Sequence, residues 1–305
     1  MITEKIYLYE DREDVFLTTY LWEQSSELPA GDQRPLVLIC PGGAYMMCSD
    51  REAEPIALRF AAMGYHAAVL RYSNYGESRN DFSKLETDDP VKPQTLYPAQ
   101  IRELGKAVLL LRERASEWHI DCDRIALCGF SAGAHNCAMY AVSWNRPILC
   151  DALKADPSVL RPAAVILGYP VVDLAVLAEV DAETRKMYGD MSLAFLGTRE
   201  PSEAQLAEVN PARHVSAHTP PMFIWATAQD STISVLNSLN LGTALSKMNV
   251  PFEMHIFEKG AHGLGLGDQA SAMVAGQIDE NVAGWPVLAE KWLAKRLALD
   301  IPVEA

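Results

Sequence analysis

The sequence lacks the features of proteins that bind nucleic acid or membranes. No stretch rich in lysine and arginine offsets its formal charge of −14, and its acidic residues are scattered. No apolar stretch is long enough to span a bilayer, and the first residues lack the basic and apolar segments of a signal peptide. We therefore expect a cytoplasmic protein that binds neither nucleic acid nor membrane.

Paired cysteines and internal repeats are also missing. The six cysteines form no Cys-x-x-Cys pair, and several lie in apolar runs, where a free thiol packs as a small hydrophobic group. We expect them to be reduced and mostly structural. The 305 residues, 49% of them hydrophobic, suffice for one large domain with an extensive core. We predict a single α/β domain over residues 1–305, and the sequence leaves the oligomeric state open.

Short apolar runs alternate with longer amphipathic stretches along the chain. This alternation predicts a mainly parallel sheet covered by helices, with about eight strands. The first two strands are expected to be antiparallel, and the central strand at residues 35–40 is stopped by Pro41, Gly42 and Gly43. Later strands are expected at residues 66–71, 124–129, 163–168, 221–226 and 252–257. Helices are expected near residues 54–63, 99–118, 235–248 and 285–299, and from about residue 132.

Two long segments between these elements are candidates for shaping a binding site. Residues 73–97 are polar and contain prolines, which is typical of a loop, and residues 174–213 carry short helical patterns with many charges. Long loops in compact domains often shape active sites. We expect residues 174–213 to form a small lid or cap.

The sharpest local motif is Gly129-Phe130-Ser131-Ala132-Gly133, placed between an apolar strand and a helical stretch. This context is that of a nucleophile elbow. The tight turn leaves no room for bulk two residues from the serine, and the following helix directs N–H groups toward an oxyanion. Ser131 is therefore the predicted nucleophile, with the Ala132 N–H as one oxyanion donor. The alternative is a glycine-rich turn with a capping serine.

A serine hydroxyl needs a basic partner and an orienting acid. A nucleophile elbow on a parallel sheet is typical of the α/β-hydrolase fold, in which the chain order is Ser, acid, His. Among seven histidines, His262 lies in a glycine-rich loop directly after the last strand and is the predicted base. The alternative is a turn histidine. His135 follows Ser131 by one helical turn and is expected to pack beneath it.

The predicted acid is Asp230, in the segment of residues 227–232 that directly follows the strand at residues 221–226. Its alternative role is to cap the next helix, as aspartates commonly do. Asp173, after the strand at residues 163–168, is a second candidate, because some proteins of this fold carry the acid there.

A second glycine motif, Pro41-Gly42-Gly43-Ala44-Tyr45, follows the central strand. Esterases of this fold carry an HGGG-type oxyanion loop at this place. Pro41 and Ala44 depart from that pattern, yet a backbone N–H donor survives an alanine. An oxyanion loop is favoured over an ordinary Pro-Gly turn because the elbow lies downstream.

Taken in order, several segments carry a family resemblance: PGGAY, SDREAEPIALRFAAMGYHAAVLRY, GFSAGAH, ILGYPVVD, TAQD with NSL, and HIFEKGAHGLGLG. Together they resemble the bacterial esterase/lipase-like α/β-hydrolases that include acetyl xylan esterases, over most of residues 37–267. The resemblance implies a triad of Ser131, Asp230 and His262, with oxyanion donors from Gly43, Ala44 and Ala132.

Two departures from the family pattern fall in the acid loop. Gln229 stands where such proteins often carry a first aspartate, and Ile233-Ser234 replaces the usual Val-Pro. The acid loop is therefore expected to differ in shape. The resemblance suggests small acyl groups, especially acetyl esters on sugars or xylo-oligosaccharides, and a cytoplasmic location would fit deacetylation of imported oligosaccharides.

The expected chemistry is ester hydrolysis through an acyl-enzyme, which needs no metal or organic cofactor. An amidase or peptidase, or a non-catalytic ligand-binding protein on the same scaffold, are the alternatives. Arg51 and Glu52 are more readily explained as a structural ion pair than as pocket residues. The candidate substrate-binding residues border the predicted catalytic loops: Tyr45, Met46, Met47, Arg51, Glu52, Tyr75 and Tyr169.

Overall fold

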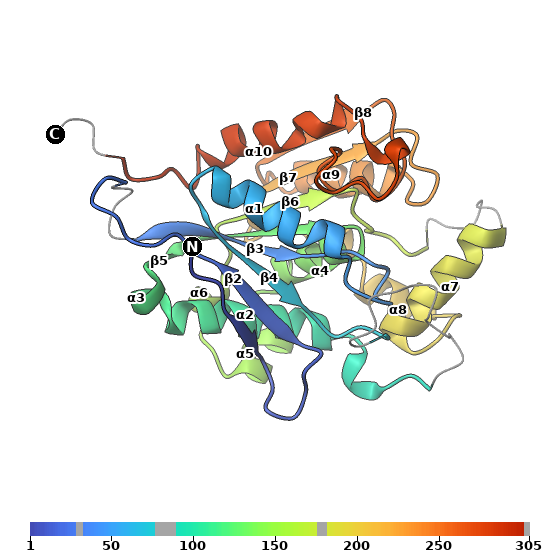
Figure 1. The fold of residues 1–305 in the computed structure, drawn as a ribbon. Coiled ribbons are helices and arrows are strands. Elements are labelled where there is room, and N and C mark those ends of the chain that lie inside the picture. Colours follow the sequence, from blue (N-terminus) through green and yellow to red (C-terminus); the bar gives the residue numbers. More distant parts are fainter. Residues whose placement is uncertain (29–32, 77–89, 176–181, 302–305) are drawn as a thin grey trace.

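The computed structural model describes residues 1–28, 33–76, 90–175 and 182–301. Its centre is an eight-stranded sheet with the strand order β1-β2-β4-β3-β5-β6-β7-β8 (Figure 1). The β1–β2 and β2–β4 pairs are antiparallel and the other pairs are parallel. The α/β-hydrolase fold and the strand count expected from the sequence are confirmed. The strands are β1 (Lys5–Tyr7), β2 (Phe16–Tyr20), β3 (Arg34–Cys40), β4 (His66–Arg71), β5 (Ile120–Phe130), β6 (Ala164–Gly168), β7 (Met222–Thr227) and β8 (Phe252–Phe257).

Helices occupy both faces of this sheet. The α-helices are α1 (Glu54–Ala62), α2 (Ala99–Glu113), α3 (Ala115–Trp118), α4 (Ala132–Ala141), α5 (Pro147–Leu153), α6 (Pro157–Leu160), α7 (Ala182–Leu196), α8 (Glu203–Glu208), α9 (Leu236–Lys247) and α10 (Trp285–Leu293). Single 3₁₀ turns are η1 (Asp50–Glu52), η3 (Pro93–Thr95), η4 (Pro211–Arg213), η5 (Ala275–Gln277) and η6 (Val282–Gly284). In the described part of the chain, no helix is both long and apolar enough to cross a bilayer.

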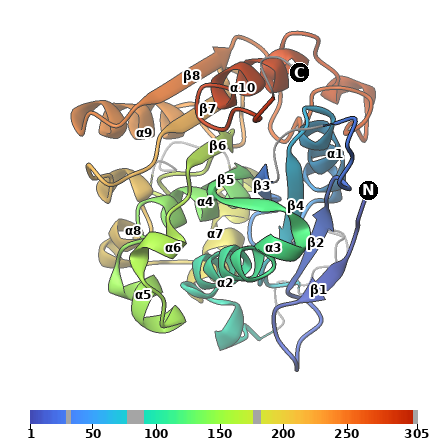
Figure 2. The ribbon, with the colours of Figure 1, turned by 90° about the vertical axis from the view of Figure 1, so that its left-hand side faces the viewer.

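Each central strand buries alternate side chains on the two faces of the sheet. In β3, Leu36 and Leu38 pack with α2 and α4, whereas Val37 and Ile39 pack with α1 and α10. Figure 2 shows α2 on the opposite side of the sheet from α1 and α10. Because strand side chains alternate between faces, a continuous apolar run is what a strand covered on both sides requires.

Several boundaries differ from those expected. The helix expected over residues 99–118 divides at Arg114, whose backbone leaves the helical region, and α10 ends at Leu293 rather than near residue 299. Helices α5 and α6 were not expected. The six cysteines are free, as expected. Residues 77–89 of the predicted long loop lie outside the described residues, while residues 93–95 form η3.

The segment expected to form a lid or cap contains α7, α8 and η4, and its residues 176–181 lie outside the described residues. Helix α7 is fixed to the core at two points. The Phe195 ring stacks on Tyr45, with centroids 4.2 Å apart, and the Tyr188 hydroxyl donates to the Thr232 carbonyl at 2.8 Å. The Val209 carbonyl, just after α8, bonds the His135 imidazole at 2.7 Å. The described part of this segment is therefore anchored beside the carboxyl ends of the strands.

Candidate active site

Strand β5 runs through a single turn residue, Ser131, directly into α4. The backbone of Ser131 has φ +51° and ψ −118°, a conformation that costs energy for any residue with a side chain. The turn closes tightly, because a Cβ on Gly129 would lie 2.3 Å from the Gly133 carbonyl oxygen. A Cβ on Gly133 would lie 2.1 Å from the carbonyl oxygen of Cys40. Both motif glycines are thus required by the space inside the turn.

Ser131, His262 and Asp230 form one hydrogen-bonded row. The His262 Nε2 atom lies 2.8 Å from the Ser131 Oγ atom, and the His262 Nδ1 atom lies 2.6 Å from the Asp230 Oδ2 atom. A carboxylate can only accept, so the row fits an imidazole that donates from Nδ1 and accepts the serine proton at Nε2. The three side chains predicted to act together are therefore brought together, although they come from loops after β5, β7 and β8.

Asp230 is held by its own loop. Its Oδ1 atom accepts hydrogen bonds from the backbone N–H groups of Thr232 and Ile233, at 2.9 and 2.8 Å. Its side chain is 1% exposed, whereas that of His262 is 18% exposed. The aspartate is thereby fixed and shielded while the imidazole reaches solvent.

Asp173, the second candidate acid, and His135, the histidine expected beneath Ser131, have other partners. Asp173 accepts a hydrogen bond from the Ala175 N–H at 2.8 Å, so it serves a local turn and not the His262 ring. His135 is buried, as expected, and its ring bonds the Tyr45 hydroxyl at 2.7 Å and the Val209 carbonyl. Burial lowers the pKa of His135 to about 4, so its imidazole is neutral at physiological pH.

The predicted oxyanion loop has an unusual backbone. Gly43, Ala44 and Tyr45 all have positive φ, at 127°, 54° and 59°. Gly43 and Ala44 line the same cavity as Ser131 and His262. Ala132 is the first residue of α4, and the first N–H groups of a helix have no partner within the helix. Gly43 and Ala44 therefore border the cavity at Ser131, and Ala132 directly follows Ser131 in the chain.

A cavity of about 230 Å³ opens beside Ser131. Its walls include Met187 and Met191 from α7 and Ile233 from the acid loop. These apolar wall residues were missed by the sequence analysis. Nothing in the local sequence around the two methionines marks them, because it is the docking of α7 that brings them to the serine.

The candidate substrate-binding residues are placed differently relative to this cavity. Arg51 and Glu52 line it, whereas Tyr45, Met46 and Tyr169 do not. Tyr45 is 1% exposed, because the positive φ of its backbone directs the side chain into the core against His135. Met46, Met47, Tyr75 and Tyr169 are likewise buried, at 5, 9, 6 and 3% exposure.

The expected ion pair between Arg51 and Glu52 is wrong. Arg51 donates to the carbonyl oxygens of Ser271 at 2.6 Å and Gly263 at 2.8 Å. Glu52 accepts from the Gly42 N–H at 2.7 Å. Although adjacent in one 3₁₀ turn, the two side chains point to different loops.

A family model described as BD-FAE matches residues 27–245. The chain belongs to the BD-FAE family. Among curated relatives, endo-1,4-beta-xylanase B of Butyrivibrio fibrisolvens is 31% identical over 253 residues, which are 83% of this chain and 34% of that protein. The chain spans about a third to a half of the length of the curated relatives it matches.

Solved structures similar to this BD-FAE chain match nearly all of it. The carboxylesterase Cest-2923 from Lactobacillus plantarum WCFS1 is 29% identical with a TM-score of 0.77, over 97% of this chain and 98% of that chain. An acetyl ester-xyloside bifunctional hydrolase from Caldicellulosiruptor lactoaceticus is 29% identical with a TM-score of 0.71, over 96% of each chain. The resemblance to bacterial esterases is thereby confirmed. By family and fold, the chain is similar to bacterial carboxylic-ester hydrolases.

Proposed function

We propose that this chain is a serine esterase that works through an acyl-enzyme and acts on small acyl esters, such as acetylated sugars or xylo-oligosaccharides. The proposal rests on one observation above all. The hydrogen-bonded row of Ser131, His262 and Asp230 ends at a small cavity lined by backbone of the oxyanion loop. A nucleophile, a base, an orienting acid and oxyanion donors are the parts that acyl transfer needs.

Acylation begins when the His262 Nε2 atom takes the Ser131 proton and the Ser131 Oγ atom attacks the ester carbonyl. The developing oxyanion accepts hydrogen bonds from backbone N–H groups among Gly43, Ala44 and Ala132. His262 then returns the proton to the leaving alcohol. Asp230 holds the imidazole in the tautomer that can accept at Nε2 and stabilises its protonated form.

Deacylation uses the same groups. A water molecule gives its proton to the His262 Nε2 atom and attacks the acyl carbonyl, and the Ser131 oxygen leaves with that proton. Neither acylation nor deacylation needs an oxidant or a reductant. In each of them, His262 accepts one proton and then returns it.

The small acyl group is supported by the size and lining of the cavity. A volume of about 230 Å³ bounded by Met187, Met191 and Ile233 leaves little room beyond a short acyl chain near Ser131. The sugar portion is supported by two relatives, one of which is a xylanase and the other an acetyl ester-xyloside hydrolase. The partly exposed Arg51 side chain at the cavity supplies a polar group for an alcohol portion.

The proposal is tested with Ser131→Ala, measured by p-nitrophenyl acetate hydrolysis on protein whose circular dichroism matches the wild type. We expect activity to fall to background. Full activity in this variant would contradict the proposal. For the substrate, release of acetate from acetylated xylo-oligosaccharides is compared with hydrolysis of p-nitrophenyl esters of increasing chain length. A preference for long acyl chains would contradict the small-acyl proposal.

A further inference from the structure

Glu52 is a buried carboxylate that the proposed reaction does not use. It closes the 3₁₀ turn η1, between the oxyanion loop and α1, and it is 4% exposed. Its two oxygens have separate donors: Oε2 accepts from the Gly42 N–H at 2.7 Å, and Oε1 accepts from the Tyr169 hydroxyl at 2.6 Å. Accepting at both oxygens fits an ionised carboxylate, which has no proton to donate. A buried charge is costly, so this placement calls for an explanation.

Tyr169 extends the contact to the loop that carries His262. Its hydroxyl oxygen accepts from the Gly265 N–H at 3.0 Å, and its ring meets the His262 imidazole edge to face with centroids 5.0 Å apart. Burial and the nearby Glu52 charge raise the pKa of Tyr169 well above its usual value, so the phenol stays protonated and donates to Glu52. One chain of hydrogen bonds thus joins the oxyanion loop to the His262 loop.

Arg51, the middle residue of the same turn, also holds the His262 loop. Its guanidinium donates to the carbonyl oxygens of Gly263, next to His262, and of Ser271. The contact between Glu52 and Gly42 is tight, because a Cβ on Gly42 would lie 2.6 Å from the Glu52 Oε2 atom. The two adjacent side chains of η1 therefore hold opposite sides of the cavity.

We propose that Glu52 is a positioning residue that fixes the spacing between the oxyanion loop and His262. The inference rests on the proposed function, because it assigns Glu52 to the machinery of that same site. The assignment needs a carboxylate in particular. Glutamine has an acceptor oxygen at only one of these two positions, so Glu52→Gln must lose one of the two contacts or reverse its donor and acceptor. Small displacements of catalytic groups lower the reaction rate strongly.

The test measures kcat and KM separately for p-nitrophenyl acetate in Glu52→Gln and Tyr169→Phe. Glu52→Gln is expected to lower kcat by about 10- to 100-fold with KM within about threefold, a smaller loss than the removal of an oxyanion donor itself causes. Tyr169→Phe keeps Glu52 and its Gly42 contact, so we expect a smaller loss of kcat, of about threefold to tenfold, with KM again within about threefold.

The two variants keep the inference open to contradiction even where one of them does not fold. Wild-type kcat in folded Glu52→Gln, or in folded Tyr169→Phe, would overturn it, as would a Glu52→Gln loss that appears in KM and not in kcat. These outcomes are distinct from failure of the proposed function, which would appear as wild-type protein with no activity above that of Ser131→Ala.

Discussion

Two glutamates, Glu52 and Glu103, are buried against loops that follow the neighbouring strands β3 and β4. Glu52 accepts a hydrogen bond from the Gly42 N–H after β3. Glu103, from α2, accepts one from the Ser73 N–H after β4, and both bonds are 2.7 Å long. Each carboxylate accepts a second hydrogen bond from a hydroxyl, that of Tyr169 for Glu52 and that of Ser73 for Glu103. Their immediate bonding is therefore much alike.

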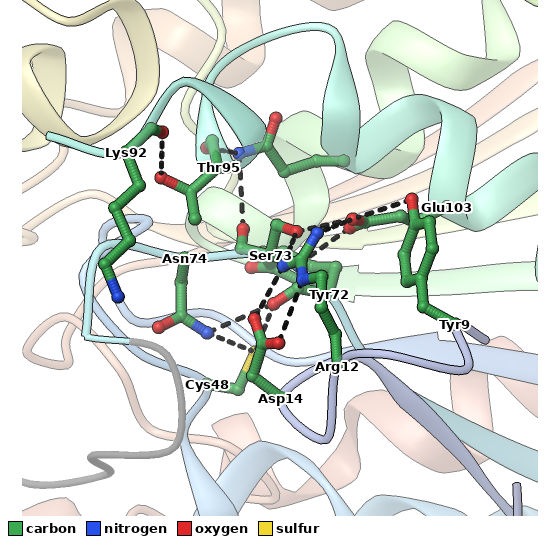
Figure 3. Close-up of polar contacts among 11 residues, drawn as sticks. Tyr9, Arg12, Asp14, Cys48, Tyr72, Ser73, Asn74, Lys92, Thr95 and Glu103 are labelled. Atoms are coloured by element: carbon green, nitrogen blue, oxygen red, sulfur yellow. Dashed lines mark hydrogen bonds and ion pairs between the residues drawn. The ribbon is translucent and has the colours of Figure 1, made fainter. Parts of the chain in front are cut away.

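The surroundings of the two glutamates differ. Figure 3 shows Glu103 among side chains from the turn between β1 and β2. The Tyr9 hydroxyl donates to it at 3.3 Å, and the Arg12 Nη1 atom lies 3.8 Å away while Arg12 also pairs with Asp14. Burial raises the pKa of Glu103 to about 7. Glu103 thus attaches the first hairpin to α2, whereas Glu52 joins two loops of the candidate active site.

The comparison teaches that the role of a buried carboxylate follows from what it connects. A substitution at Glu52 is expected to change the rate, and one at Glu103 is expected to change the stability. Both substitutions replace a buried carboxyl group by an amide, so each variant serves as a control for the other.

The largest effect is expected at Asp230, because it acts on His262 directly. Asp230→Asn presents an amide that favours the wrong imidazole tautomer, so kcat should fall by about 10³- to 10⁴-fold. The matched control is Asp173→Asn, which removes the other candidate acid and should change kcat by less than about threefold. Measuring kcat for ester hydrolysis by the two purified variants shows which aspartate is the acid. A larger loss in the Asp173 variant would reassign the acid.

The second largest effect is a pH dependence of the free energy of unfolding that arises from Glu103. Because the folded pKa of about 7 exceeds the ordinary value of 4.5, the folded protein keeps a proton that the unfolded chain loses between these values. This contribution to stability is fully present below pH 4.5 and is lost as the pH rises through 7. The free energy of unfolding of the wild type should therefore fall by about 3 kcal/mol relative to Glu103→Gln over this range.

Urea unfolding of wild type and Glu103→Gln at several pH values measures this difference. Glu103→Gln should also keep kcat within about twofold of the wild type, in contrast to Glu52→Gln. Parallel stability curves for the two proteins would contradict the assigned pKa. A loss of kcat as large as that of Glu52→Gln would remove the distinction between the two glutamates.

The smallest effect concerns the acyl group. Met191 is 1% exposed and lines the cavity beside Ser131, so Met191→Ala should make room for longer acyl chains. We expect the ratio of kcat/KM for butyrate over acetate esters to rise about fivefold, within the range that one or two methylenes contribute in an apolar pocket. Met139→Ala, a buried methionine of α4 that does not line this cavity, is the control. An unchanged ratio in Met191→Ala would place the acyl group elsewhere.

Local patterns were sufficient to predict the strands and the elbow. The elbow needs only two glycines, one serine, a strand before them and a helix after them, and all are within a short stretch of sequence. The chain order of this fold then pointed to Asp230 and His262. The single-domain organisation over residues 1–305 stays a prediction.

Contacts between distant segments could not be predicted in this way. Glu52 and Tyr169 are 117 residues apart, and Arg51 and Gly263 are 212 apart. Proximity in sequence instead suggested an ion pair between Arg51 and Glu52 and a pocket role for Tyr45. In both cases the backbone conformation, a 3₁₀ turn and a positive φ, directs the side chains away from the places that sequence proximity suggested.

The central claim, that Ser131 is a nucleophile activated by His262, is tested most directly by fluorophosphonate labelling followed by peptide mass spectrometry. We predict one adduct, on Ser131, that is absent in folded Ser131→Ala, forms more slowly in Glu52→Gln and forms at the wild-type rate in Glu103→Gln. Folded wild-type protein that takes up no label, or that carries it on another residue, would contradict the account.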